Sequence, residues 1–119
     1  MRNKVIGACL FAALASGCVQ RTYKRTVVFL LDTKDVKNIH SVGIRGVDKP
    51  LSWDYDKPLA TLKKDSVYKV SATFFTGYTF TEVKFVINDQ FELKDQPNRR
   101  VNFTDNDTTV YKAVFNRSK

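Results

Sequence analysis

A two-residue alternation of apolar and polar side chains runs through the middle of the chain and constrains the fold more than any other sequence feature. In SVYKVSATFF, residues 66–75, one face carries Tyr68, Val70, Ala72 and Phe74, and the other face is mostly polar. Successive side chains of an extended strand point to opposite faces, so this period predicts a half-buried β-strand. No window of about a dozen residues shows the period of an amphipathic helix.

Other segments carry the same kind of signal. In YTFTEVKFVIND, residues 78–89, the apolar face holds Thr81, Val83, Phe85 and Ile87. An apolar run without alternation is typical of a strand buried on both faces, and TVVFLLD at 26–32 is such a run. Shorter strand signals occur in SVGIRG (41–46), in DQFEL (89–93) after a tight turn, in RRVNFT (99–104) and in TTVYKAVFN (108–116).

About seven or eight short strands in about 100 residues predict an all-β fold, a single antiparallel immunoglobulin-like β-sandwich. We expect the last two strands to pair as a hairpin across Asp105, Asn106 and Asp107, because Asp and Asn favour turns. The chain shows no internal repeat, no low-complexity tract and no sign of a second domain.

The first residues have the pattern of an export signal. Two basic residues precede an apolar run that is too short to span a membrane as a helix, and small residues follow as far as Cys18. The sequence ASGC resembles a bacterial lipobox, with Ala15 in place of the usual branched residue. This resemblance implies cleavage before Cys18 and a lipid on that cysteine. Ordinary secretion, with Cys18 left as a thiol, is the alternative.

The signal pattern divides the chain. We expect a lipoprotein signal peptide at 1–17, a lipidated tether at 18–25 and a β-sandwich domain at 26–119. Removing 17 of the 119 residues leaves 102, enough for one domain. Cys9 leaves with the signal and Cys18 is acylated, so neither a disulfide nor a thiolate metal site is expected. The predicted location is the bacterial cell envelope, with the outer membrane favoured and the membrane contacted through the lipid on Cys18.

The net charge and the small number of catalytic or metal-binding residue types exclude several classes of function. Loss of the signal lowers the formal charge from +8 to +6, and the basic residues are scattered, which favours solubility or attraction to an anionic surface over binding of nucleic acid. The one histidine, His40, has no cysteine or activated serine to assist, and is expected at the surface. The acidic pairs, Asp54 with Asp56 and Asp105 with Asp107, are typical of turns. We therefore predict a protein that is not an enzyme and needs no metal or cofactor.

The order of motifs around the only tryptophan carries a family resemblance. SVGIRG is followed by a loop with SWD at 52–54, then by VYKVSATF, VKFVIND and QPNRR. This order resembles the starch-binding and glycogen-binding modules that are attached to amylases and glucoamylases. The resemblance covers residues 26–115, and its most specific parts are SWD, VKFVIND and QPNRR. It implies a non-catalytic domain that binds an α-glucan or a related polysaccharide.

The resemblance also implies site residues. Trp53 is the first ring that stacks on sugar, Lys84 matches the lysine of the family's Tyr-Lys strand, and Asn98 matches the asparagine before the arginine. The family's Trp-Glu pair falls on residues 93 and 94, which are Leu and Lys here. Phe91 and Glu92 lie two residues earlier, and a longer turn restores a ring and a carboxylate. Phe91 and Leu93 are expected on one strand face, so that Phe91 reaches the same neighbourhood.

Each of these residues also has a structural interpretation. Trp53 fits a plug at the base of the loop as well as it fits a platform, because tryptophan is often largely buried. Lys84 fits an ordinary solvent-facing lysine, and Asn98 fits a turn residue. Arg99 fits a structural role, either paired with Glu92 or bound to loop carbonyls. The alternative function is a structural or adaptor β-sandwich lipoprotein that binds an envelope protein partner and no sugar.

Overall fold

The structure is a computed structural model, and it describes residues 21–118. These residues form nine β-strands and no helix. Consequently, no helix within this part of the chain is long and apolar enough to cross a membrane. The strands are β1 (Tyr23–Asp32), β2 (Val42–Gly46), β3 (Lys57–Pro58), β4 (Ala60–Lys63), β5 (Val67–Thr76), β6 (Phe80–Ile87), β7 (Gln90–Phe91), β8 (Arg99–Asn102) and β9 (Thr108–Val114).

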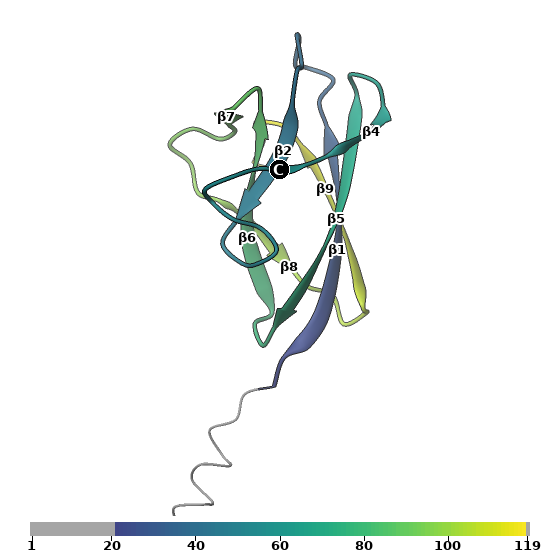
Figure 1. Ribbon diagram of the computed structural model, residues 1–119, viewed down its shortest axis with the longest axis vertical. Helices are drawn as coiled ribbons and strands as arrows, with labels where there is room; N and C mark the ends of the chain where they lie inside the picture. Colours follow the sequence, from purple (N-terminus) through teal and green to yellow (C-terminus); the bar gives the residue numbers. More distant parts are fainter. Residues whose placement is uncertain (1–20, 119) are drawn as a thin grey trace, which may run out of the picture.

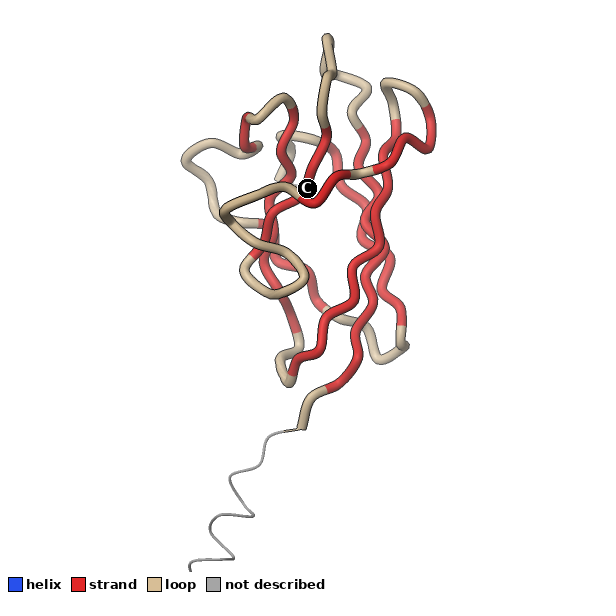
Figure 2. The backbone as a smooth tube through the Cα atoms, viewed as in Figure 1, coloured by secondary structure: helices blue, strands red, loops and turns tan. Residues whose placement is uncertain are grey.

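The strands form two sheets that face each other as a sandwich, as the sequence predicts (Figure 1). One sheet has the order β4-β5-β1-β9, and the other has the order β3-β2-β6-β7, with β8 also paired to β6. All pairs are antiparallel except β1 and β9, which run parallel from the pair Thr26–Thr108 to the pair Asp32–Val114. Figure 2 shows loops gathered at the two ends of the sandwich and along one flank.

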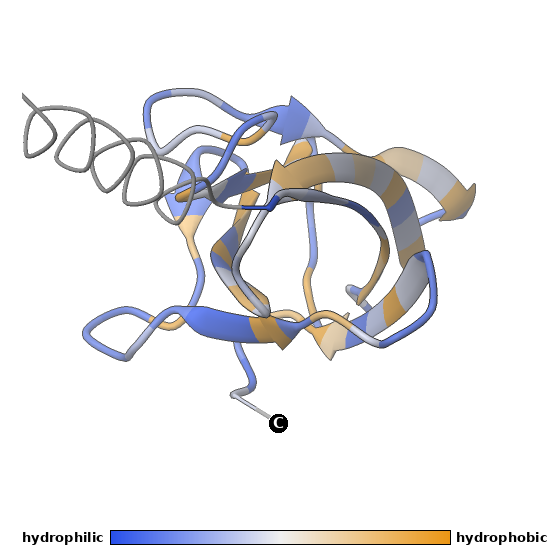
Figure 3. Cartoon of the chain, turned by 90° about the horizontal axis from the view of Figure 1, so that it is seen from below, coloured by the Kyte–Doolittle hydropathy of each residue, from blue (hydrophilic) through white to orange (hydrophobic). Residues whose placement is uncertain are grey.

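The core lies between the sheets and is built by the predicted alternation. On β5 the buried side chains include Tyr68, Ala72 and Phe74, and on β6 they include Val83 and Phe85, so the predicted faces of both strands are confirmed. The alternation shows as bands of orange and blue along the strands in Figure 3. Aromatic edges contact each other across the core, as where the Phe29 and Phe85 ring centroids are 6.1 Å apart.

The apolar run at 26–32 is buried on one face only, contrary to the prediction. Val27, Phe29 and Leu31 have no exposed surface, whereas Val28 and Leu30 are half-buried. The second face of β1 points out of the sandwich, because no element of the described chain covers this sheet from outside. An apolar run predicts a strand well, but it does not say whether a second layer will cover it.

The predicted hairpin between the last two strands is also wrong. β8 pairs with β6 in one sheet and β9 pairs with β1 in the other, so the turn at 104–107 carries the chain between sheets. Two hydrogen bonds hold Thr104 in this turn. Its backbone N–H donates to Thr109 Oγ1 at 2.9 Å, and its carbonyl accepts from Arg25 Nη1 at 3.1 Å. Turn-forming residues predict that the chain changes direction, but they do not predict which strand the next segment will pair with.

The first strand begins earlier than predicted. β1 starts at Tyr23, within the segment assigned to a tether. The predicted signal peptide, Cys18 and the start of the tether lie outside the described residues. The described residues, 21–118, form both sheets and a hydrophobic core between them.

One edge of β6 is shared by two short strands. β8 pairs with its first half, from Phe80 to Val83, and β7 pairs with Val86 and Ile87. Residues 92–98 leave the sheet between these two pairings and return at Arg99. β7 and β8 therefore act as one edge strand that is interrupted by a loop. This loop forms one wall of the candidate site.

Candidate functional site

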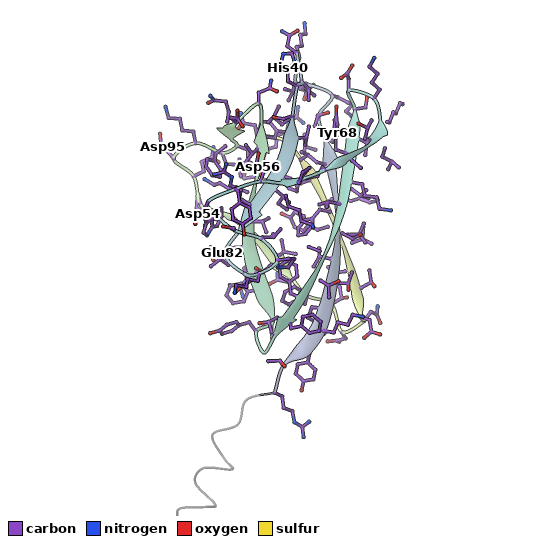
Figure 4. The ribbon with its side chains drawn as sticks, viewed as in Figure 1. His40, Asp54, Asp56, Tyr68, Glu82 and Asp95 are labelled. Atoms are coloured by element: carbon purple, nitrogen blue, oxygen red, sulfur yellow. The ribbon has the colours of Figure 1, made fainter. Side chains whose placement is uncertain are left out.

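An open hollow of about 600 Å³ lies beside the interrupted strand. The five residues predicted to bind carbohydrate all line it, although they come from three separate segments: Trp53, Lys84, Phe91, Glu92 and Asn98. Figure 4 shows Asp54, Asp56 and Asp95 on the same flank of the molecule. The structure thus brings the predicted residues together, and it assigns them different roles.

Trp53 and Phe91 form the aromatic part of the hollow. Their ring centroids are 6.4 Å apart and the ring planes are inclined by 51°. Phe91 is 45% exposed, and Trp53 is half-buried and lies outside the hydrophobic core. Rings at this distance make a favourable tilted contact while leaving surface open to solvent. The pair is an apolar patch with an accessible face.

The residue of this loop that enters the core is Leu51, which is 4% exposed. Gly46 makes room for it, because a Cβ at Gly46 would lie 2.8 Å from the Leu51 Cδ1 atom. The interpretation of Trp53 as a core plug is therefore wrong, since Leu51 fills that place. Trp53, two residues after Leu51 in the same loop, lines the hollow instead.

Arg45 holds the aromatic pair in position. Its Nε donates to Asp56 Oδ1 at 2.6 Å, and its Nη1 donates to the Trp53 carbonyl at 3.0 Å. Its guanidinium also lies 5.1 Å from the centre of the Phe91 ring, within the range of a cation–π contact. Arg45 thus fixes the Trp53 loop and the Phe91 ring together.

The sequence prediction missed Arg45 and Asp56. The only signal for Arg45 was its polar position on β2, next to the buried Ile44. Asp56 fits against the strand because residue 43 is glycine, and a Cβ at Gly43 would lie 2.7 Å from the Asp56 Cβ. This close approach between β2 and the loop is not visible in the sequence.

The Glu92 carboxylate is buried and hydrogen-bonded within the protein. Glu92 is 1% exposed, and its carboxylate accepts two bonds from Arg99, at 2.7 and 2.8 Å. It also accepts the backbone N–H groups of Phe85 at 2.8 Å and Asn116 at 3.0 Å. The Phe85 N–H faces the gap between β7 and β8, where strand pairing is interrupted. Glu92 replaces the missing backbone acceptor there.

Arg99 completes this buried network and joins the two sheets. Besides Glu92, it donates to the carbonyls of Val114 at 2.8 Å and Arg117 at 2.7 Å. Burial lowers the pKa of Arg99, but the hydrogen bonds and charge of Glu92 outweigh it, so the pKa lies above its ordinary value. The expected alternatives for Arg99, pairing with Glu92 and binding of loop carbonyls, are both confirmed.

Phe91 and Leu93 do not share a strand face, contrary to the prediction. β7 ends at Phe91, which is exposed, while Leu93 is 1% exposed with a positive φ of 52°. Leucine rarely adopts this backbone conformation. Here the Leu93 N–H donates to Asn116 Oδ1 at 2.8 Å and its carbonyl accepts from Lys84 Nζ at 3.1 Å. Burial and both hydrogen bonds hold Leu93 beneath the loop.

Lys84 and Asn98 are both engaged within the protein. Lys84 Nζ donates to the carbonyls of Leu93 and Gln96, at 3.1 and 2.9 Å, so it fastens the loop to β6. Asn98 Nδ2 donates to Glu82 Oε1 at 3.2 Å, and its side chain remains exposed. Lys84 is therefore neither a free solvent lysine nor a free donor. Asn98 is an exposed residue of the hollow.

The polar rim consists mainly of residues that the sequence prediction did not select. The exposed side chains at the hollow are those of Asp89, Gln90, Lys94, Asp95 and Asn98. Asp89 and Asp95 have positive φ angles, of 63° and 62°, which aspartate tolerates in turns. Carboxylate, amide and ammonium groups around two rings can bond hydroxyl groups while the rings contact an apolar face.

The described residues show no group suited to metal binding. Within residues 21–118, no three His, Cys, Asp or Glu side chains are close enough to hold an ion. His40 lies at the tip of the molecule, away from the hollow (Figure 4), and its backbone N–H donates to Asn88 Oδ1 at 2.6 Å. His40 is exposed, as predicted.

Neither a scan against protein-family models nor a search of curated proteins finds a match for this chain.

Proposed function

We propose that the protein is a non-catalytic lipoprotein of the bacterial envelope that binds a polysaccharide, with an α-glucan favoured, at the Trp53–Phe91 hollow. One observation carries the proposal. Two aromatic rings that lie far apart in the sequence meet at 6.4 Å on the wall of an open hollow with a polar rim. The resemblance of the SWD and QPNRR segments to starch-binding modules supports the same ligand class.

The chemistry of sugars matches this arrangement. A pyranose ring exposes a patch of C–H groups on one face and hydroxyl groups around its edge. Trp53 and Phe91 supply the apolar contact, while Gln90, Asn98 and Asp95 supply donors and acceptors at the edge. Glu92 and Lys84, which the sequence also selected, act by holding the loop in place rather than by contacting sugar.

The shape of the hollow sets the expected affinity. The site is open and shallow, so each sugar unit buries little surface and the affinity of a single site is modest. Display of many copies on one membrane would raise the avidity for a polymer. A lipid on Cys18 would provide this display, and loss of lipid labelling in Cys18→Ser is the test of the anchor.

Fluorescence of the single tryptophan provides the test of sugar binding. We expect a saturable change in Trp53 emission on addition of maltoheptaose. Phe91→Ala should weaken this binding by about tenfold, which corresponds to about 1.4 kcal/mol of lost contact. Tyr55→Ala is the matched control, because Tyr55 is 66% exposed in the same loop as Trp53 but does not line the hollow.

Two results would overturn the proposal. One is the absence of any emission change with maltoheptaose together with no retention on insoluble starch. The other is equal loss of binding in the folded Phe91→Ala and Tyr55→Ala variants. A cello-oligosaccharide titration run in parallel separates the linkage: stronger binding of the β-linked chain would contradict the preference for an α-glucan.

A further inference from the structure

The outer face of the four-stranded sheet carries exposed lysines and apolar side chains with almost no acid. Because alternate residues of each strand fill the core, the others point outward. We define the basic face as the outward side chains Lys24, Lys69, Phe75, Val110 and Lys112, from β1, β5 and β9. All five are exposed, with Phe75 at 71% and Val110 at 57%.

The strand register shows that these side chains are neighbours. Leu30 on the inner strand β1 lies between Lys69 on β5 and Lys112 on β9. One step along, Val28 pairs with Val110, and near the start of β1, Lys24 pairs with Phe75. The Lys24–Phe75 pair and the group around Leu30 and Val28 therefore share one sheet surface, with the hydroxyl side chains of Thr26, Thr73 and Thr108 between them. Figure 1 shows β1 and β5 in the layer opposite β2 and β6.

The charge of this surface is mostly positive. Among the described residues of β1, β4, β5 and β9, Asp32 is the only acid, and it ends β1 in an ion pair with Lys34 at 3.2 Å. Other acids near the sheet, such as Asp65 and Asp107, lie in turns at its ends. An anionic surface would meet attraction over the whole face, and a second copy of this chain would meet repulsion between lysines.

We propose that the basic face docks on an anionic lipid bilayer. Exposed apolar side chains such as Phe75 and Val110 enter the headgroup region, while the lysine ammonium groups remain with the lipid phosphates. The lysine stems add apolar contact to the same surface. An acidic polymer would use only the lysines and would leave the two apolar side chains without a role. The combination therefore favours a bilayer over a soluble polyanion.

The position of the chain's start agrees with this occupant. β1 is one of the two inner strands of the sheet, and four residues separate Cys18 from Tyr23, so the two Cα atoms are at most about 17 Å apart. This step alone rests on the proposed lipid anchor. The Trp53–Phe91 hollow lies on the other sheet, which contains β2 and β6. Docking on the basic face would therefore leave the hollow open to solvent.

Vesicle flotation of residues 21–119, without any lipid attached, tests the docking surface. We expect binding to vesicles of phosphatidylglycerol mixed with phosphatidylcholine, little binding to phosphatidylcholine alone, and release by salt. Lys69→Glu combined with Lys112→Glu should weaken binding by about twentyfold or more, because each basic residue near an anionic membrane contributes about a fivefold factor.

A second double variant makes the test specific. Lys37→Glu with Lys49→Glu changes the net charge equally at exposed positions outside the basic face, and should weaken binding far less. Phe75→Ser tests the apolar contribution, with an expected loss of severalfold at unchanged charge. Thermal unfolding of each variant verifies that it remains folded.

Three outcomes would overturn the inference: no binding to anionic vesicles, equal loss in the two lysine variants, or binding to dextran sulfate with none to vesicles. The glucan proposal is tested separately, by titrating maltoheptaose into the same variants. A variant that loses vesicle binding but still binds maltoheptaose has a defect in the basic face alone. A variant that loses maltoheptaose binding but still binds vesicles has a defect in the hollow alone.

Discussion

Two arginine–carboxylate pairs hold segments of the candidate site in place, and the two pairs differ in burial. The side chains of Arg99 and Glu92 are 4% and 0% exposed, whereas those of Arg45 and Asp56 are 21% and 23% exposed. Both pairs have a short contact, of 2.7 and 2.6 Å. Their chemistry is the same, so the difference in environment decides what each pair does.

The buried pair joins the two sheets. Glu92 and Arg99 replace strand pairing at the break between β7 and β8, and they also bind the end of β9 and residues beyond it. The half-buried pair acts locally, because Arg45 and Asp56 orient one loop and one ring. Removal of one partner from the first pair should therefore affect the fold, and from the second pair mainly the site.

The largest expected effect is that of Glu92→Ala. The change removes the only carboxylate among the described residues that pairs with the buried Arg99 charge, and it leaves the buried Phe85 N–H and the partly buried Asn116 N–H without their acceptor. We expect the free energy of unfolding to fall by about 3–5 kcal/mol, measured by urea denaturation. Glu82→Ala is the control, since Glu82 is half-buried and accepts a side-chain bond from Asn98, and should cost less than about 1 kcal/mol. Equal losses of unfolding free energy in Glu92→Ala and Glu82→Ala would contradict the conclusion that burial makes the Glu92–Arg99 pair important for the fold.

Asp56→Ala should have a moderate effect on stability and a visible effect on the site. Loss of a partly exposed, charge-assisted hydrogen bond should lower the free energy of unfolding by about 1–2 kcal/mol. The freed Arg45 would hold the Trp53 loop less firmly, so Trp53 emission should shift to longer wavelength. Asp54→Ala, an exposed neighbour whose side chain forms no ion pair, should change neither quantity. A loss as large as that of Glu92→Ala would contradict the comparison.

The smallest effect is expected at Asp32, whose ion pair with Lys34 is more exposed still. The Lys34 backbone N–H, with help from its ammonium group, lowers the pKa of Asp32. Because the folded-state pKa is lowered, the contribution to stability is present above the ordinary carboxyl pKa of about 3.9 and is lost as pH falls through the folded-state value. Asp32→Asn should thus lower stability by less than about 1 kcal/mol at neutral pH, with no difference at the acid end.

Urea denaturation of Asp32→Asn and the unchanged protein across this pH range checks the prediction. The two curves should converge below the ordinary carboxyl pKa. A difference that stays constant with pH would show that the amide disturbs the turn and that the charge of Asp32 has no part in it.

The prediction from sequence succeeded where the signal is local. The buried faces of β5 and β6 follow from alternation, which depends only on the geometry of an extended chain. It failed where pairing between distant strands decides the outcome. The turn at 105–107 was predicted to form a hairpin, yet β9 lies parallel to β1, where Ala113 is buried in the core and Tyr111 packs against it.

The site shows the same division in finer detail. The sequence identified Trp53 and Phe91, but it placed Leu93 on the wrong side of the loop. Leu93 has a positive φ and is held by burial and by hydrogen bonds to Asn116 and Lys84, both of which are distant from it in the sequence. Glu92 and Arg99 were expected as possible partners, and their burial depended on the interruption of the strand.

By itself, the sequence determined that this chain forms strands, which of their faces are apolar, and that aromatic and amide residues occur in its loops. Those properties belong to short segments, and each segment carries its own hydrophobic pattern. Only the tertiary structure decided that Trp53 meets Phe91, that Leu51 rather than Trp53 enters the core, and that lysines and apolar side chains share one open face. These relations arise when segments distant in sequence are packed together, and no local pattern encodes the distance between them.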